Sequence, residues 1–384
     1  MATGTDAGLL DEARPQSVFK HSILDQYIIR FATMTARNLT PRRSVLVDGF
    51  AGRGRHDNGS AASAECMMLA AQKARNLTQI PIFLVEQKQK DFKVLDGVAD
   101  EYRARGLQIE TRHGDCGDYL GEIVKLARGS SLFLFLDPCG ANLPWTLLAP
   151  VLSNKARGDW PRTEALLNFN ADLTRRAGGR LHAGQVDTDG VRCLDTVCGG
   201  DWWRQVALDA FEACGRKDWE SAAQNVAMEY ARRLSRQAKM YCMIAPVSRR
   251  AHHQPVYHLI FLTHDVHGLW VMGDSLAVAR QKWLRALEPD LQDGQGMLFS
   301  TIDDQIDQEQ IDSAGVIRTN LRNLLADGSP KSVVEHTTAI FKDVYGLAKE
   351  TTYNKVLREL IRADEVEFIV KGKKPHNSVI QKKK

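Results

Sequence analysis

The sequence predicts an α/β fold in which a mostly parallel sheet is covered by helices on both faces. Apolar runs typical of buried parallel strands alternate with helical patterns along the first half of the chain. Two later apolar runs, MYCMIAPVS and VYHLIFLTHD, are separated only by RRAHHQP, which is too short for a crossover helix. We therefore expect these two runs to pair antiparallel as a hairpin, so that the last strand of the sheet runs against the others.

The expected elements follow one another from the N-terminus. Residues 1–17 are polar and expected to be flexible, and an amphipathic helix follows with apolar residues at helical spacing: Ile23, Leu24, Tyr27, Ile28 and Phe31. Buried strands are expected in SVLVDGF, IPIFLVEQ, LQIETRHGD, SLFLFLDPCG and EALLNFN, with helical patterns between them. From about 171 to 238 the pattern is mainly helical, which indicates an insertion before the last two strands.

The C-terminal part of the chain is expected to form a separate domain. Residues 288–313 are rich in Asp, Gln and Gly with little periodicity, which is the composition of a linker. Beyond it, three short helical patterns and a strand that enters a basic turn, EVEFIVKGKKP, predict a winged-helix-like domain over 314–384. The sheet domain is then expected over 18–287.

The bulk composition indicates an ordinary globular protein. The chain has 384 residues, of which 43% are hydrophobic and 26% charged, and its length favours about two domains. The formal charge of +4 permits an anionic partner without demanding one. The N-terminus lacks a signal pattern and the apolar runs are too short for a membrane span, so we expect a cytoplasmic protein. Seven cysteines without a C-x-x-C pair suggest neither a disulfide framework nor a zinc site.

The segment VLVDGFAGRGRH, residues 45–56, leads from the first expected strand into a glycine-rich loop. Such a loop can hold a phosphate, hold a nucleoside or be a turn without a ligand. The carboxylate of Asp48 would oppose a phosphate, because phosphate sites need backbone N–H groups and positive potential. S-adenosylmethionine fits better, since its amino group and sulfonium are cationic and Gly52 and Gly54 let its methionine part approach the backbone.

Carboxylates also stand at the ends of the next expected strands, and parallel strands bring such ends to one edge of a sheet. Glu86 ends the second strand, where it can accept hydrogen bonds from the two ribose hydroxyls. Asp115 follows the third, where it can accept from an adenine amino group while the backbone N–H of Cys116 faces the ring. A simple Gly-Asp turn is the alternative there. Together with Asp48 and Asp137, these residues predict one nucleoside cofactor site.

The fourth expected strand ends in Asp137-Pro138-Cys139-Gly140, where Asp137 would orient a methyl acceptor or take its proton. Methyltransferases that act on the amino groups of bases place an aromatic residue after such an Asp-Pro. Its absence here weighs against methylation of a flipped base. Asn168, at the next strand end, is a second candidate for positioning the acceptor, and a structural role is equally open. Cys139 has no neighbouring His or basic residue that would make it a nucleophile.

Other conspicuous residues receive plainer interpretations. The histidines of the last hairpin region show no paired metal spacing: His252, His253, His258, His264 and His267. Trp202, Trp203 and Phe211 are expected to pack rather than to stack on bases. The basic runs RRLSRQAK and VKGKKPHNSVIQKKK are usually solvated, but the second lies on the expected wing. The candidate nucleic-acid-binding residues are therefore Lys355, Lys371, Lys373 and Lys374.

The chain resembles the three-Cys-motif partner proteins (TcmP), a family found in bacteria and some phages. The resemblance spans roughly residues 18 to 285 and rests on FKHSILDQYI, VDGFAGRGRHDNGSAASA, FLVEQ, LFLFLDPCG, LLNFN, GGDWWRQ and VYHLIFLTHDVHGLWVMGDSL. It implies a Rossmann-like class I methyltransferase sheet that uses S-adenosylmethionine. It also implies association with a separate protein whose three-cysteine motif is similar to that of radical-SAM enzymes.

Residue by residue, the resemblance implies that Asp137 and Pro138 form the catalytic edge and that Lys20 and His21 lie on a helix that lids the site. The cofactor-binding residues expected on all these grounds are Lys20, His21, Asp48, Phe50, Ala51, Gly52, Gly54, Glu86, Gln87, Asp115, Cys116 and Asp137. The chain departs from the family where Cys139 replaces an aromatic residue and where Ala62-Ser63-Ala64 replaces a Ser-Pro. The first departure affects the expected substrate pocket more than cofactor binding.

Three functions follow as hypotheses. The first is an S-adenosylmethionine-dependent methyltransferase that acts on nucleic acid, with Asp137, Pro138 and Asn168 at the catalytic edge. The second is an accessory subunit that binds the cofactor and presents substrate to a three-cysteine-motif partner. The third is a winged-helix DNA-binding regulator with an inert sheet domain. The sequence leaves the acceptor atom open, and it leaves open whether the substrate is DNA, RNA or protein.

Overall fold

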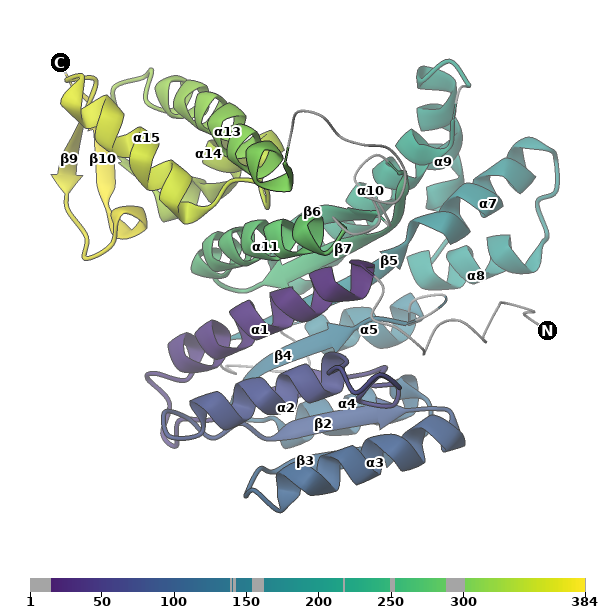
Figure 1. The fold of residues 1–384 in the computed structure, drawn as a ribbon. Coiled ribbons are helices and arrows are strands. Elements are labelled where there is room, and N and C mark those ends of the chain that lie inside the picture. The colour runs from purple at the N-terminus through teal and green to yellow at the C-terminus, as the bar shows by residue number, and fades with distance from the viewer. Residues whose placement is uncertain are drawn as a thin grey trace. The chain divides into compact units, whose positions relative to one another are not determined.

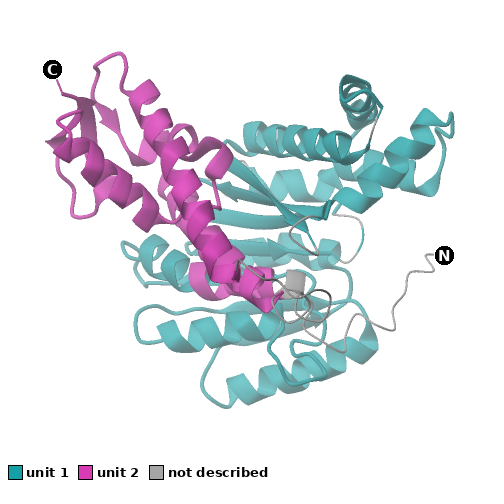
Figure 2. Cartoon of the chain, turned by 45° about the horizontal axis from the view of Figure 1, so that its top comes forward, with its two compact units in different colours: residues 1–17, 28–264 teal, residues 18–27, 265–384 magenta. Residues whose placement is uncertain are grey.

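A computed structural model of the protein describes residues 15–138, 140, 143–153, 162–216, 218–248, 253–287 and 301–383 (Figure 1). The chain divides into two compact units, and Figure 2 shows them in separate colours. Unit 1 holds residues 1–17 and 28–264, and unit 2 holds residues 18–27 and 265–384. None of the helices within these described residues is both long and apolar enough to span a membrane.

Unit 1 contains a seven-stranded sheet with the strand order β3-β2-β1-β4-β5-β7-β6. Neighbours from β3 to β5 pair parallel, whereas β7 pairs antiparallel with both β5 and β6. The predicted α/β class and the antiparallel hairpin are therefore confirmed. The strands are β1 Ser44–Asp48, β2 Ile82–Glu86, β3 Ile109–His113, β4 Ser131–Leu136, β5 Thr163–Asn170, β6 Tyr241–Ser248 and β7 Pro255–Thr263.

One face of the sheet is covered by α4, α5 and an insertion of helices between β5 and β6. Their apolar side chains form the main core with every second strand residue, including Val45, Val47, Leu134 and Phe169. These helices are α4 Cys116–Leu126, α5 Trp145–Leu152, α7 Ala171–His182, α8 Asp189–Cys198, α9 Trp202–Ala213 and α10 Glu220–Ala238. The last four confirm the predicted helical insertion.

The strand residues that alternate with this core point to the other face. There the ring of Phe133 on β4 lies 5.5 Å from that of Phe31 in the second half of α1. Helices α2 and α3 pack against β1, β2 and β3. The bounds of these helices are α1 Pro15–Thr35, α2 Ser63–Ala74 and α3 Gln89–Arg103. Helix α1 begins three residues earlier than the amphipathic pattern suggests.

Unit 2 packs around Trp270, whose ring lies about 5 Å from those of Phe341, Tyr353 and His376. Its sheet has the order β8-β10-β9, and both pairings are antiparallel. Its elements are α11 Val266–Ala286, α13 Ile302–Leu324, β8 Lys331–Ser332, η1 Val334–His336, α14 Thr337–Phe341, η2 Lys342–Val344, α15 Glu350–Arg362, β9 Val366–Val370, η3 Pro375–Asn377 and β10 Val379–Lys382.

The structure differs from the predicted linker of residues 288–313. Residues 302–313 are the first half of α13, which begins with a capping box between Thr301 and Asp304. Its buried residues, among them Ile306 and Ser313, lie on one face of the helix, so the polar composition conceals a helical pattern. Helix α11, expected within the sheet domain, belongs to unit 2, where the Tyr345 hydroxyl donates to the carbonyl of Leu269 at 2.6 Å.

Candidate functional site

The glycine-rich loop after β1 is held by the backbones of both neighbouring strands. The N–H of Gly49 donates to the carbonyl of Phe135 at the end of β4, and that of Ala51 donates to Val85 on β2. Gly52 and Gly54 then adopt the left-handed conformation, with φ of 57° and 76°. A Cβ on Gly52 would meet no atom within 4 Å, so the loop leaves open space there for a ligand. This geometry is compatible with the predicted close approach of a ligand to the backbone, which stays a prediction.

Asp48 lies beneath this loop and is completely buried. Its Oδ1 accepts from the N–H of Phe50 at 3.0 Å, and its Oδ2 accepts from the hydroxyl of Ser63 at 2.6 Å. Ser63 is the first residue of α2, so the carboxylate ties the loop to the next helix. In this structure Asp48 therefore shapes the loop from below.

Glu86 is fixed at the end of β2 by two backbone donors. Its Oε2 accepts from the N–H of Gly52 at 2.8 Å, and its Oε1 accepts from the N–H of Lys88 at 2.7 Å. Each carboxylate oxygen has two lone pairs, so each can accept a further hydrogen bond. The side chain is half-buried at the edge of the sheet, which suits a pair of vicinal hydroxyls.

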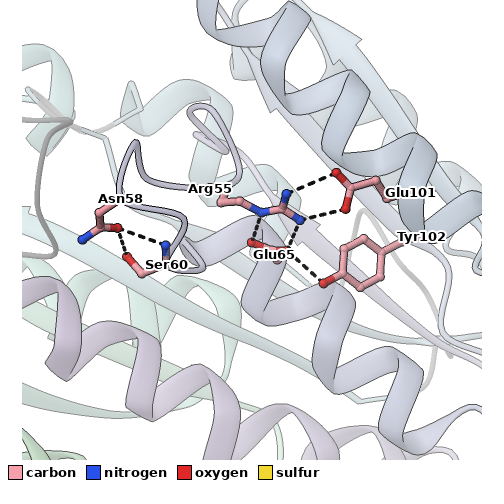
Figure 3. Close-up of polar contacts among 6 residues, drawn as sticks. All are labelled: Arg55, Asn58, Ser60, Glu65, Glu101 and Tyr102. Carbon is pink, nitrogen blue, oxygen red and sulfur yellow. Dashed lines mark hydrogen bonds and ion pairs between the residues drawn. The ribbon is translucent and has the colours of Figure 1, made fainter.

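A partly exposed ion-pair network links the end of the loop to the helices α2 and α3 (Figure 3). The guanidinium of Arg55 donates to Glu65 on α2 and to Glu101 on α3, in both cases through two nitrogens. The Tyr102 hydroxyl donates to Glu65 at 2.9 Å, and burial together with this hydrogen bond raises the pKa of Tyr102 to about 12. Arg55 also lowers the pKa of Glu101. The network joins the loop to both helices that follow it.

Asp115 is the N-cap of α4, and its Oδ1 accepts from the N–H of Gly117 at 2.7 Å. The residue is exposed, and its Oδ2 lies 3.5 Å from the amide nitrogen of Gln87. The capping role explains why an Asp stands here, and it leaves the second oxygen facing Gln87 at the sheet edge. Both the turn and the adenine interpretations are therefore compatible with this geometry.

Cys116 packs under the loop rather than facing solvent. It is 2% exposed, and a Cβ on Gly49 would lie 2.6 Å from its Sγ. Burial, followed by the charges of Asp115 and Asp48, raises the pKa of the Cys116 thiol to about 12. Its side chain is thus an inert packing group.

The structure brings two candidate residues together: Asp137, which directly follows β4, and Asn168 on the adjacent strand β5. The Nδ2 of Asn168 donates to the Oδ1 of Asp137 at 2.6 Å. Asn168 is 9% exposed, and among the described residues its buried Oδ1 has no hydrogen-bond partner. Because a carboxylate can only accept, the amide nitrogen must face Asp137 and the amide oxygen is left for another donor. Pro138 is buried beside them, and Cys139 lies outside the described residues.

Other predicted site residues lie elsewhere in the chain. Lys20 and His21 are on the part of α1 that belongs to unit 2, and their role at the cofactor stays a prediction. Lys355 is exposed on α15, and the turn between β9 and β10 exposes the other three predicted lysines, Lys371, Lys373 and Lys374. Phe50 is partly buried in the loop next to Ala51.

Sequence reasoning missed two contributors to the site. Ser63 was read only as part of a departure from the family pattern, yet it is the hydroxyl partner of Asp48. The Arg55 network was missed because its carboxylates come from two helices. The signal available was the position of Ser63 at the start of the helical run that follows the loop.

No family model and no curated protein matches the chain. It is similar to three solved structures at low identity: the small RNA methyltransferase HEN1 (10% identity, TM-score 0.35, 64% of this chain and 25% of that chain), M. jannaschii TYW2 in complex with AdoMet (9%, 0.30, 65% and 74%), and the O-methyltransferase TomG from Streptomyces achromogenes in complex with SAM (11%, 0.32, 67% and 92%).

These likenesses concern the fold alone. The strand order with the antiparallel β7 is that of the Rossmann-like methyltransferase sheet, so this part of the prediction is confirmed. The resemblance to three-Cys-motif partner proteins stays a prediction.

Proposed function

We propose that the protein is an S-adenosylmethionine-dependent methyltransferase that acts on nucleic acid. The observation that carries the proposal is the pair formed by Asp137 and Asn168, whose buried amide oxygen has no partner among the residues that the structure describes. A buried polar atom without a partner costs free energy, so its persistence at a sheet edge is best explained by a ligand group. Two oxygen acceptors side by side suit an acceptor that carries N–H or O–H hydrogens.

The residues present fit the proposed cofactor. Gly52 leaves open space next to its backbone, and Glu86 is held so that both of its oxygens can receive ribose hydroxyls. The second carboxylate oxygen of Asp115 and the side chain of Gln87 lie where the adenine is expected. S-adenosylmethionine, when bound, supplies a methyl group on a positively charged sulfur.

The chain's own residues would orient the acceptor and accept its proton. Asn168 and Asp137 hold the acceptor by its hydrogens, which leaves its lone pair directed at the methyl carbon. The cofactor would supply the methyl group to this lone pair and would keep the electron pair of its carbon–sulfur bond. The acceptor's proton passes to Asp137 or to water. Positioning of this kind supplies much of the rate enhancement in bimolecular transfers.

Two features of unit 2 support a nucleic-acid substrate. Its order of helices, short strand, helices and a two-stranded hairpin is compatible with the expected winged helix, in which the β9–β10 turn would be the wing. Lys371, Lys373 and Lys374 are exposed on this turn, and exposed lysines are suited to phosphate contacts. Association with a three-cysteine-motif protein stays a prediction, with no surface assigned to it.

Calorimetric titration with S-adenosylmethionine, combined with transfer of a labelled methyl group to nucleic acid, tests the proposal. We expect Glu86→Gln to weaken cofactor binding, whereas Glu122→Gln, at an exposed position on α4, leaves it unchanged. Asp137→Asn is expected to lower transfer about 100-fold or more. Failure of the wild-type protein to bind the cofactor would contradict the proposal, and binding without transfer would favour the accessory-subunit hypothesis.

A further inference from the structure

A cavity of about 440 Å³ opens on the helical insertion of unit 1, apart from the residues assigned to the cofactor. It is lined by Trp145 at the start of α5, by Gly199 and Trp202 at the turn between α8 and α9, and by Arg233 and Arg236 on α10. Its volume lies within the range of small-molecule sites. Two indoles and two guanidinium groups in one cavity are the feature that needs an explanation.

Trp145 is held rigidly against the backbone. Gly199 has a φ of 68°, and a Cβ there would lie 2.5 Å from Cγ of Trp145, so only glycine allows the indole this close. On its other side Trp145 packs edge-to-face on Tyr230, with the ring centroids 5.7 Å apart. The indole is only partly buried, so it presents a fixed aromatic surface to the cavity.

Trp202 is fixed just as firmly. Its Nε1 donates to the carbonyl of Cys198 at 2.9 Å, and the guanidinium of Arg233 lies over its ring at 4.2 Å. The neighbouring Trp203 is completely buried, which confirms the packing role expected for it. Trp202 is instead half-buried. It packs as expected, but it also lines the cavity.

The charge on the cavity wall is positive. Arg233 is neutralised by Glu229 at 2.9 Å, whereas Arg236 is exposed, and within the described chain its side chain has no ion pair. The basic run RRLSRQAK was expected to be a solvated face. Two of its three arginines instead line a cavity that also holds two indoles.

We propose that this cavity binds a nucleotide of a single-stranded nucleic acid, with its base stacked on the indoles and its phosphate on Arg236. The inference rests on the proposed function, since it assigns a binding site for the methylated chain. Every base has a flat π-face, and aromatic side chains beside basic ones are the usual platform for single strands. An acidic peptide could pair with the arginines, but its binding would not explain why two tryptophan side chains line the same cavity.

The test compares the binding of two fluorescein-labelled single strands to the full-length protein by fluorescence anisotropy. One is a short oligothymidylate, and the other is the same sugar-phosphate chain without bases. We expect the wild-type protein to bind the base-bearing strand roughly tenfold more tightly or better, since stacking contributes that much per base. Trp202→Leu is expected to abolish this preference while the affinity for S-adenosylmethionine is unchanged.

Arg236→Gln is a second variant that cannot fail through misfolding, because Arg236 is exposed and unpaired within the described chain. We expect it to weaken oligothymidylate binding and to lower the salt dependence by about one released counterion. Arg232→Gln removes the same charge from the next turn outside the cavity and is expected to have little effect. Thymidine monophosphate is expected to compete weakly, because the site is assigned to a chain.

The outcomes separate this inference from the proposed function. If the wild-type protein binds neither strand, the nucleic-acid substrate and the cavity assignment both fail. If it binds both strands equally, or if Trp202→Leu keeps the preference for bases, only the cavity assignment is overturned. Tight binding of free thymidine monophosphate would likewise overturn the assignment to a nucleic-acid chain.

Discussion

At the scale of single residues, the hydroxyl of Ser63 matters because it partners a completely buried carboxylate. Ser63→Ala would leave Oδ2 of Asp48 without this donor, so we expect a loss of about 1–3 kcal/mol in the free energy of unfolding and weaker cofactor binding. Ser60→Ala, which removes a hydroxyl bound only to exposed Asn58, is the control. Denaturant titration measures the free energy of unfolding of both variants. Equal losses in the two variants would contradict the role assigned to Ser63.

Cys116 offers a chemical test of how the loop is packed. With its pKa raised to about 12, the thiol stays protonated at neutral pH and lacks the reactive thiolate. We expect iodoacetamide at about pH 8 to leave Cys116 unmodified in the native protein and to alkylate it after unfolding in guanidinium. Peptide mass spectrometry reads this directly. Rapid alkylation in the native state would show that the thiol is accessible and that the loop is packed differently.

Individual residues also show how far sequence reasoning reached at the site. Asp137 and Asn168 could be brought together from sequence, because they lie near the carboxyl ends of adjacent parallel strands whose order the fold class specifies. The burial of Asp48 could not be predicted from the sequence, because it depends on where α2 begins relative to the loop. The same holds for the Arg55 network, whose partners on α2 and α3 meet only after both helices have packed.

At the scale of elements, Gly49 sets how closely the loop approaches α4 and β4. A Cβ there would lie 2.6 Å from both Cys116 Sγ and Leu136 Cδ2. We expect Gly49→Ala to destabilise the protein by about 1–3 kcal/mol and to displace the loop, weakening cofactor binding. Gly97→Ala on α3 has open space and is expected to stabilise by about 0.5–1 kcal/mol. Thermal unfolding of both variants checks these two expectations. A Gly49→Ala variant with the stability of the wild-type protein would contradict the first.

Strand β7 carries a histidine that makes stability depend on pH. His258 is buried, and its Nδ1 has no hydrogen-bond partner within the described chain; burial followed by the charge of Arg175 lowers its pKa from 6.5 to about 4. The unfolded chain takes up a proton that the native protein cannot, so this stability is present above pH 6.5 and is lost as the pH falls toward 4. The full loss is on the order of 3 kcal/mol.

The His258 effect is measured as the slope of the unfolding free energy against pH, between 6.5 and about 5, where few carboxylates titrate. His258→Leu is expected to flatten this slope whatever it does to the stability itself. An unchanged slope would mean that another group binds the proton.

The elements also show where patterns succeed and where they fail. The β6–β7 hairpin was predictable because its short connection excludes a crossover helix. The start of α13 was not predictable from the apolar pattern. Acidic and amide side chains fill its exposed face and hide the spacing of Ile302, Ile306 and Ser313. A capping signal, Thr301 followed by Asp304, stood in the sequence and would have located it.

At the scale of the whole molecule, the boundary of unit 2 decides how nucleic-acid binding can be tested. Deleting residues 314–384, the domain expected from sequence, would cut α13 in the middle and remove Phe341 and Tyr353 from the Trp270 cluster. Such a truncation would unfold the rest of unit 2. A loss of nucleic-acid binding would then not show which residues contact the nucleic acid. Point changes on the β9–β10 turn avoid this, because Lys371, Lys373 and Lys374 are exposed.

We therefore expect the triple change of Lys371, Lys373 and Lys374 to Gln to weaken the binding of duplex DNA and of single strands alike. If each lysine contacts one phosphate, the slope of log affinity against log salt falls by about 2–3. The preference for base-bearing over abasic strands is expected to persist, because we assign only charge to these three lysines and assign stacking to the cavity on the helical insertion. A triple variant with unchanged salt dependence would show that the wing does not contact phosphates.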